Sequence, residues 1–165
     1  MGKEIERKFL VKPDFDRSST PALVLDISQG YLCLDVERSV RVRVSRWRGW
    51  HQQAFITVKG ASKRATRPEY EFELANVDEA QEMIDTLCKF VIRKQRTIIK
   101  HAGHEWYVDQ FQDDNTGLII AEIELSSEDE QFELPPWVGT EVTDDARYYN
   151  LALAQTPYNK WDNNQ

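Results

Sequence analysis

The chain has 165 residues, of which 41% are hydrophobic and 30% are charged, and its formal net charge is −7. This composition is ordinary for a globular protein of one domain, and the chain is long enough to bury a core of its own. The negative charge argues against a general binder of nucleic acid or of anionic membranes, because such proteins need a basic surface. No apolar run approaches a membrane span and no signal-peptide core is visible, so we expect a cytoplasmic protein.

Most of the chain alternates between polar and apolar residues, which predicts strands with one charged and one apolar face. In chain order, the predicted strands lie near residues 3–11, 29–34, 39–46, 56–59, 69–74, 93–99, 105–109 and 121–125. Two helices interrupt them. The first is capped by Asn76 or Asp78 and extends to about Val91, because apolar residues recur at helical spacing there. The second starts near residues 143–145, after a connecting loop over Ser126–Thr140.

Acidic and basic residues are segregated along the chain. Residues 38–68 contain nine Lys or Arg and no acid, whereas residues 101–146 contain thirteen Asp or Glu and no Lys or Arg. A charged strand face is usually the solvated side of a half-buried sheet. Here, however, most strand faces carry charges of one sign only, and like charges on neighbouring strands repel one another. The repulsion is relieved if acidic and basic strands face each other across a shared space. An eight-stranded antiparallel sheet closed into a barrel supplies that space, with charges inside and apolar faces packed outward against the helices. We expect one domain over residues 1–165, with a core over 3–154 and a tail over 155–165.

The two sets of charges predict a site for metal-bound polyphosphate. The acidic set is Glu4, Glu6, Glu71, Asp109, Glu122 and Glu124. Crowded carboxylates need compensation, and the hard cations Mg²⁺ and Mn²⁺ prefer carboxylate oxygen. The basic set is Lys8, Arg41, Arg43, Lys59, Lys94 and Arg96. Arg forks and Lys ammonium groups suit phosphoryl oxygens, so this set predicts an anionic ligand of high charge density.

The order of these residues resembles the CYTH domain, that is, the triphosphate tunnel metalloenzyme superfamily. Residues 4–8, Glu-Ile-Glu-Arg-Lys, are similar to the E-x-E-x-K signature of that family. The likeness continues through residues 29–32, 40–43, 57–59, 69–71, 94–96, 108–109, 121–124 and 142–150, and covers about residues 3–154. It implies an eight-stranded antiparallel tunnel with a charged lumen, and hydrolysis or cyclisation of a triphosphate with Mg²⁺ or Mn²⁺.

The resemblance also implies roles for individual residues. The basic set matches positions that bind phosphate, the acidic set matches the metal-side carboxylates, and Arg147 matches a basic residue of the helix that closes one tunnel mouth. One divalent metal would polarise the phosphate chain, and a second, held partly by Glu4 and Glu6, would activate the attacking water. Tyr31 beside Lys59 could protonate the departing pyrophosphate; alternatively, Tyr31 packs at the tunnel edge while Lys59 simply pairs with phosphate. Trp47 and Trp50 either stack on an organic ring or pack at the edge of the sheet.

In its short length and its opening motif, the chain is most similar to the short bacterial members of the CYTH family, many of which cleave inorganic tripolyphosphate. A class IV adenylate cyclase and a thiamine triphosphatase remain alternatives, because the same lumen charges would serve all three substrates. A non-catalytic polyphosphate-binding module is the alternative from another class, but it would lack a metal-side carboxylate, and none is missing here. We expect a small triphosphate as the partner, no nucleic acid and no membrane, and a homodimer as the oligomeric state.

Overall fold

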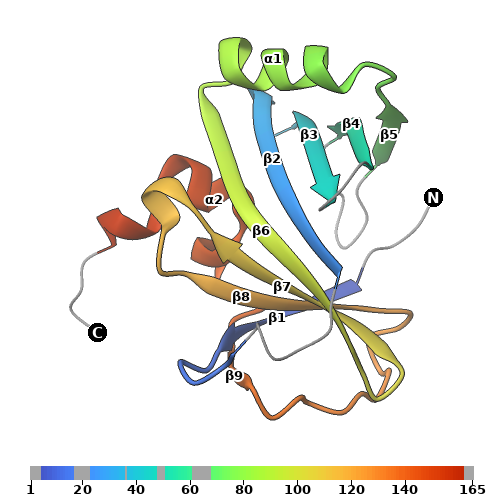
Figure 1. The fold of residues 1–165 in the computed structure, drawn as a ribbon, viewed down its shortest axis with the longest axis vertical. Helices are drawn as coiled ribbons and strands as arrows, with labels where there is room; N and C mark the ends of the chain where they lie inside the picture. Colours follow the sequence, from blue (N-terminus) through green and yellow to red (C-terminus); the bar gives the residue numbers. More distant parts are fainter. Residues whose placement is uncertain (1–4, 17–22, 36, 48–50, 61–67, 162–165) are drawn as a thin grey trace. The chain divides into compact units, whose positions relative to one another are not determined.

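The computed structural model describes residues 5–16, 23–35, 37–47, 51–60 and 68–161 (Figure 1). In these ranges the chain is mainly β, with nine antiparallel strands, two α-helices and three short 3-10 helices. It divides into two compact units, whose boundaries fall inside strands β2 and β6. Of the described residues, those between 25 and 93 belong to the first unit, and those between 5 and 24 and between 94 and 161 belong to the second unit.

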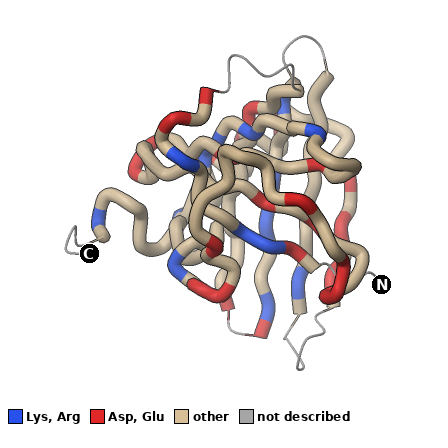
Figure 2. The backbone as a smooth tube through the Cα atoms, turned by 90° about the horizontal axis from the view of Figure 1, so that it is seen from below, with Lys and Arg blue, Asp and Glu red and all other residues tan. Residues whose placement is uncertain are grey.

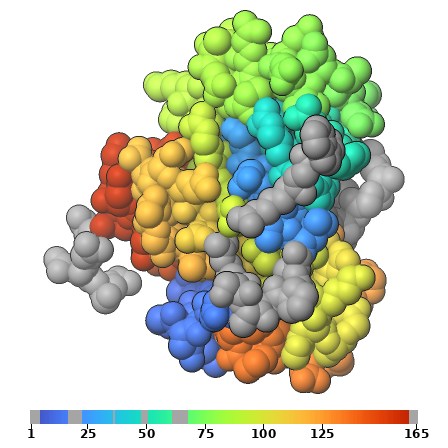
Figure 3. Space-filling view, viewed as in Figure 1, coloured from blue at the N-terminus to red at the C-terminus, as the bar shows by residue number. Residues whose placement is uncertain are grey.

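In the first unit a helix covers the apolar face of four strands. Their order is β5 (Glu69–Glu73), β4 (Gln52–Lys59), β3 (Ser39–Trp47) and β2 (Leu23–Leu34), and α1 (Val77–Leu87) follows β5 in the chain. The core of this unit is made of Val42, Val44, Ala54, Ala80 and Ile84, which come from β3, β4 and α1. The residues of α1 form a continuous part of the unit's surface (green in Figure 3). The predicted packing of an apolar strand face against a helix is confirmed here.

The cap of α1 was predicted, but its end was not. The side chain of Asn76 accepts hydrogen bonds from the backbone N–H groups of Asp78 and Glu79, as expected for an N-cap. The helix ends at Leu87, however, and Val91 lies in β6 (Phe90–His101). The prediction of a helix to Val91 was wrong because Val91 packs against the same core as the helix, so its apolar character fitted either structure.

In the second unit the apolar face is covered by aromatic side chains from irregular segments. The strand order is β6, β7 (His104–Phe111), β8 (Ile119–Leu125), β1 (Ile5–Val11) and β9 (Val138–Glu141). The core includes Phe9, Trp106 and Val108. Phe15, Phe132 and Trp137 pack against that core. In the part of this unit that the structure describes, loop residues therefore cover the apolar face of the strands, as α1 does in the first unit.

Strand β9 lies in a segment that was predicted to be a connecting loop. The strand pairs with β1 through Val138 opposite Val11 and Glu141 opposite Phe9, and Gly139 comes so close that an added Cβ would lie 3.0 Å from the backbone oxygen of Leu10. The prediction was wrong for residues 138–140, because Val-Gly-Thr-Glu after two prolines is too short to show an alternating pattern. The described strands thus number nine instead of eight, and their closure into a barrel stays a prediction.

The last part of the chain folds back onto the second unit. It contains η3 (Ala146–Tyr148), α2 (Asn150–Gln155) and η4 (Tyr158–Lys160), where one helix starting near residues 143–145 was predicted. Asn115, at the end of η2 (Asp113–Asn115), accepts a hydrogen bond from the backbone N–H of Tyr158 at 2.8 Å. Residues 155–161 are therefore a packed part of this unit. No helix in the described ranges is both long and apolar enough to cross a membrane.

Candidate active site

Each unit carries a charged face on the side of its strands that is opposite to its apolar core, as the alternation predicted. We call first charged face the set Gln29, Tyr31, Arg41, Arg43, Thr57, Lys59, Glu69 and Glu71. We call second charged face the set Glu6, Lys8, Lys94, Arg96, Asp109, Glu122 and Glu124. Figure 2 marks both kinds of charge along the strands. Glu4, the remaining residue of the acidic set, lies outside the described residues.

Asp109 is the most deeply buried charge of the second charged face, with none of its side chain exposed. Its Oδ2 accepts hydrogen bonds from Lys94 Nζ at 2.5 Å and from Arg96 Nη2 at 2.7 Å, and its Oδ1 accepts one from Arg96 Nε at 2.7 Å. Arg96 lies directly opposite Asp109 across β6 and β7, which permits this bidentate contact. Both oxygens of Asp109 are thus occupied by cationic side chains.

Glu122 connects this pair to β1. Its Oε2 accepts a hydrogen bond from Arg96 Nη2 at 2.7 Å, and its Oε1 accepts one from Lys8 Nζ at 2.6 Å. Lys8, opposite Glu122 in the register of β1 and β8, also pairs with Glu6 Oε1 at 2.6 Å. Three cations and three carboxylates therefore form one continuous network across four strands, and their formal charges cancel.

The network keeps Asp109 and Glu122 ionised despite their burial. Burial alone would raise the pKa of Asp109, but the charges of Lys94 and Arg96 outweigh it and hold that pKa at about 2. Burial and the neighbouring Asp109 also act to raise the pKa of Glu122, yet Lys94, Arg96 and Lys8 together lower it. Burial would lower the pKa of Lys8, but Glu122 and Glu6 raise it. Asp109, Glu122 and Lys8 are therefore charged at neutral pH, whereas burial lowers the pKa of Lys94.

The carboxylates at the rim of this face suit a divalent cation better than those inside it. Glu6 lies directly opposite Glu124 in the register of β1 and β8, and 39% of the Glu6 side chain is exposed. Like charges at facing strand positions repel, and a hard cation between them would relieve that repulsion. Among the described residues, no group of three or more His, Cys, Asp or Glu is arranged to hold a metal. Glu6 and Glu124 are therefore two described carboxylates that could contribute oxygens to a metal site, and they do not form a complete site by themselves.

The first charged face is looser. Glu71 Oε2 accepts a hydrogen bond from the Thr57 hydroxyl at 2.8 Å and lies 3.8 Å from Arg41 Nη2 and 3.7 Å from Arg43 Nη2. Arg41 Nη2 donates to the Thr57 hydroxyl oxygen at 3.2 Å. Arg41 Nε is buried and has no hydrogen-bond partner among the described residues. This face therefore contains a cationic N–H donor that no described residue satisfies.

Tyr31 and Lys59, the predicted acid dyad, belong to strands that are separated by β3. The Tyr31 hydroxyl accepts a hydrogen bond from Gln29 Nε2 at 3.3 Å, and Lys59 Nζ pairs with Glu69 Oε2 at 2.8 Å. Arg41 pairs with Tyr31 on one side and with Thr57 on the other. Two strand spacings put the Cα atoms of Tyr31 and Lys59 about 10 Å or more apart. Their joint action in proton transfer stays a prediction.

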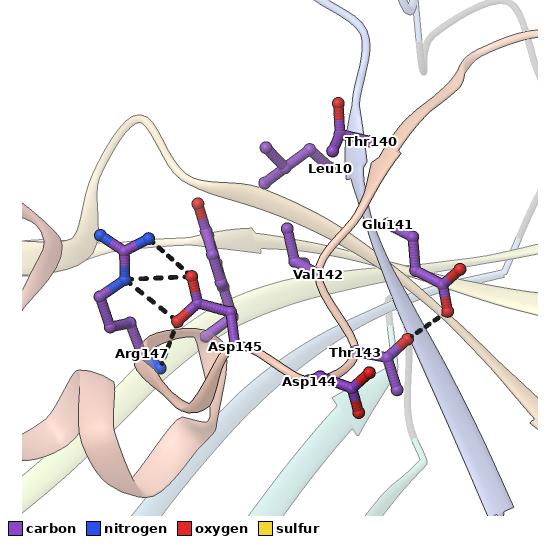
Figure 4. A pocket seen from close by; sticks show the side chains of 9 residues that line it. Leu10, Thr140, Glu141, Val142, Thr143, Asp144, Asp145 and Arg147 are labelled. Atoms are coloured by element: carbon purple, nitrogen blue, oxygen red, sulfur yellow. Dashed lines mark hydrogen bonds and ion pairs between the residues drawn. The ribbon is translucent and has the colours of Figure 1, made fainter. Parts of the chain in front are cut away.

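Arg147 lies beside an open pocket of about 480 Å³ in the second unit (Figure 4). Its guanidinium pairs with Asp145 at 2.6 Å and stacks on the ring of Trp161, 5.1 Å from the ring centre. The pocket is lined by Leu10, Thr140, Glu141, Val142, Thr143, Asp144, Asp145, Arg147 and Tyr148. Arg147 thus sits near the start of the last helical segment, as predicted, and its role toward phosphate stays a prediction.

Two uncharged residues that contact predicted site residues were missed. Thr57 bonds Arg41 and Glu71, and Asn150 at the start of α2 has its Oδ1 3.5 Å from Lys94 Nζ. Alternation with Ile56 and Val58 already placed Thr57 on the face of Lys59, but the sequence assigned no role to its hydroxyl. Of the two tryptophans considered, Trp47 packs beside the ring of His51 at 4.8 Å, and Trp50 lies outside the described residues.

Comparison with known proteins gives a consistent result over nearly the whole chain. The family model of the CYTH domain matches residues 2–154. An inorganic triphosphatase from Acetivibrio thermocellus is 45% identical over 96% of this chain and 97% of its own length. An inorganic triphosphatase from Nitrosomonas europaea is 35% identical over 92% of this chain and 96% of its own. A crystal structure of an inorganic triphosphatase matches with a TM-score of 0.67 and 32% identity, covering 93% of this chain and 95% of the other.

Proposed function

Because the chain belongs to the CYTH domain family, we propose that it is an enzyme that hydrolyses inorganic tripolyphosphate to pyrophosphate and phosphate. Two relatives with this activity in their names match more than nine-tenths of the chain. The observation that carries the proposal in the structure is that charges of both signs gather on the strand face opposite the core of each unit, although Arg7 and Arg46 lie on the core side. Such faces are costly to maintain without a ligand of matching charge.

In this proposal the basic residues bind the phosphate chain. Arg41, Arg43 and Lys59 of the first charged face outnumber their partners Glu69 and Glu71, so this face has a net positive charge. Lys8, Lys94 and Arg96 of the second charged face, with Arg147, would bind further phosphoryl oxygens. We propose that the strands close into a tunnel in which both sets act on one substrate. Family membership supports this closure.

The carboxylates divide into two groups in the proposed mechanism. Glu6 and Glu124, with Glu122 and the undescribed Glu4, would hold Mg²⁺ or Mn²⁺. A bound divalent cation polarises phosphoryl oxygen and lowers the pKa of bound water. Asp109 and Glu71, which the sequence placed with the metal ligands, contact cationic side chains in the structure. We propose that these two orient the cations that bind phosphate.

The leaving pyrophosphate needs a proton, and Tyr31 is the proposed donor. Tyr31 is buried in the first charged face, on the same side of the strands as Arg41. The Tyr31→Phe variant should lower kcat by about tenfold or more with little change in the Kd for tripolyphosphate, because the ring is kept and only the proton is lost. An unchanged kcat would remove Tyr31 from the mechanism.

One experiment tests the proposed function directly. The purified protein is supplied with tripolyphosphate, thiamine triphosphate or ATP, each with Mg²⁺, Mn²⁺ or a chelator, and products are identified by chromatography. We expect pyrophosphate and phosphate from tripolyphosphate as the fastest reaction, and no reaction with chelator. Cyclic AMP as the main product would overturn the proposal in favour of a cyclase. Metal-dependent binding of all three without turnover would favour a binding module.

A cytoplasmic location and a homodimer stay predictions, which fractionation and light scattering would check.

A further inference from the structure

Thr57 occupies the centre of the first charged face although it carries no charge. It stands in β4 directly between Arg41 of β3 and Glu71 of β5, so the three residues form one row across the strands. Its side chain is fully buried. The methyl group of a buried threonine packs like any apolar group. Its buried hydroxyl, in contrast, needs hydrogen-bond partners for its hydrogen and its lone pairs.

The partners of the Thr57 hydroxyl are the two charged neighbours in this row. It donates its one hydrogen to Glu71 Oε2 at 2.8 Å and accepts from Arg41 Nη2 at 3.2 Å. The direct distances between Glu71 Oε2 and the two guanidinium groups, 3.8 and 3.7 Å, are longer than a hydrogen bond. The hydroxyl is therefore the short link between the carboxylate and Arg41.

This arrangement determines what Arg41 can offer to a ligand. One of its terminal nitrogens is used by Thr57, whereas its Nε is buried without a hydrogen-bond partner among the described residues. If Glu71 bonded Arg41 in the bidentate mode that Arg and carboxylate groups prefer, two donors would be consumed by the carboxylate. The Thr57 hydroxyl instead accepts a hydrogen bond from Arg41 and donates one to Glu71. The Glu71 carboxylate therefore stays near enough to balance the charge of Arg41 without the bidentate contact.

We propose that Thr57 is a positioning residue for triphosphate binding: its hydroxyl holds Glu71 as a shared counter-ion of Arg41 and Arg43 and leaves guanidinium donors for phosphate. This inference rests on the proposed function, because it assigns Thr57 to the binding of the same substrate. The residue acts through Arg41 and need not touch the substrate.

The test compares three single variants of the full-length protein. Thr57→Val keeps the shape and the β-branch but removes the hydroxyl, Thr57→Ser keeps the hydroxyl, and Thr97→Val removes a buried hydroxyl from the core-facing side of β6. Calorimetric titration with tripolyphosphate in chelator measures binding without turnover, and steady-state assays with Mg²⁺ give kcat and KM. We expect Thr57→Val to weaken binding and raise KM about tenfold, the size of one hydrogen bond to a charged group. Thr57→Ser should lie within about threefold of wild type, and Thr97→Val should bind as wild type does.

A second comparison separates positioning from a loss of structure. In an Arg41→Met background the additional change Thr57→Val should weaken tripolyphosphate binding by less than twofold, because the residue through which Thr57 acts is absent. A full additional tenfold loss, or a Thr57→Ser variant as weak as Thr57→Val, would overturn the inference. Wild-type affinity in Thr57→Val would overturn it too. If the wild-type protein neither bound nor cleaved tripolyphosphate, the proposed function itself would fail, which is a distinguishable result.

Discussion

The two charged faces contain similar side chains but differ in how closely their cations and carboxylates approach one another. In the second charged face the ion pairs of Asp109 and Glu122 are 2.5–2.7 Å long, and their side chains are at most 9% exposed. In the first charged face Glu71 lies 3.7–3.8 Å from its two arginines, and its side chain is 36% exposed. Close, dry pairs are costly to break, whereas loose and partly hydrated pairs contribute little to stability.

This difference suggests a division of labour. In the second charged face the network of three cations and three carboxylates has no net formal charge, so its cations are held by carboxylates before any ligand arrives. The first charged face has a surplus of one positive charge and a buried donor on Arg41 without a partner among the described residues. We therefore expect changes in the second face to affect folding first, and changes in the first face to affect ligand affinity first.

The largest effect should follow from Asp109→Asn. This change leaves Lys94 and Arg96 buried beside an uncharged amide, and breaking a buried pair in this way costs about 3–5 kcal/mol of unfolding free energy. Urea unfolding followed by circular dichroism measures the loss. The control in the same unit is Glu105→Gln, because Glu105 lies 3.7 Å from the largely exposed Lys100 and should cost less than about 1 kcal/mol. Equal losses in the two variants would contradict the comparison.

The next largest effects are expected in a pair of arginine variants, one of which should lose affinity for tripolyphosphate while the other loses stability. Arg41→Met removes a loosely paired cation, so we expect the Kd for tripolyphosphate to rise about tenfold to a hundredfold while the unfolding free energy changes by less than about 1 kcal/mol. Arg96→Met removes the cation shared by Asp109 and Glu122, and it should cost about 3 kcal/mol of stability. Calorimetric titration and urea unfolding of both proteins give the two quantities. A destabilised Arg41→Met protein would show that the first face is not the looser one.

Acid should weaken the second charged face in a defined pH window. Because the pKa of Asp109 is lowered from 3.8 to about 2, its stabilising contribution is complete above pH 4 and is lost as the pH falls toward 2. The lost free energy is about 2 kcal/mol, and the lowered pKa of Glu122 adds to it in the same direction. Urea unfolding at several pH values between 6 and 2 (~0.5 unit apart) measures this slope. In Asp109→Asn the slope should be shallower; an identical slope would show that other carboxylates are responsible.

The sequence predicted the faces but not the pairs within them. Alternation alone placed Glu122 and Lys8 on charged sides of strands, because the side-chain period of a strand is two. Register cannot be read from alternation, so nothing indicated that Arg96 faces Asp109 across β6 and β7. The metal-side role of Asp109 stays a prediction, and the sequence placed Thr57 beside Lys59 without showing its contacts with Arg41 and Glu71 on the neighbouring strands.

The local errors in secondary structure have the same origin. Val91 suited a helix stripe as well as a strand, because the core of the first unit accepts apolar side chains from both. Strand β9 is held by its partner β1 and by the close approach of Gly139, neither of which leaves a pattern in four residues. Helices and strands whose apolar residues recur with a regular period could be predicted from the sequence. Elements that are defined by contacts with residues distant in the chain could not.

The smallest effect is expected at the edge of the first charged face. Glu69→Gln releases Lys59 from a pair that is 2.8 Å long but about one-third exposed at the carboxylate, so stability should change by less than about 1 kcal/mol. The freed ammonium group should bind tripolyphosphate slightly more tightly, by about two- to threefold at low salt, because a competing anion has been removed. At about 0.5 M salt the gain should vanish, since exposed charges are then screened. Calorimetric titration at both salt concentrations measures the change. A weaker affinity in Glu69→Gln would mean that Glu69 orients Lys59 as Asp109 is proposed to orient Lys94, and the two faces would then differ less than their distances suggest.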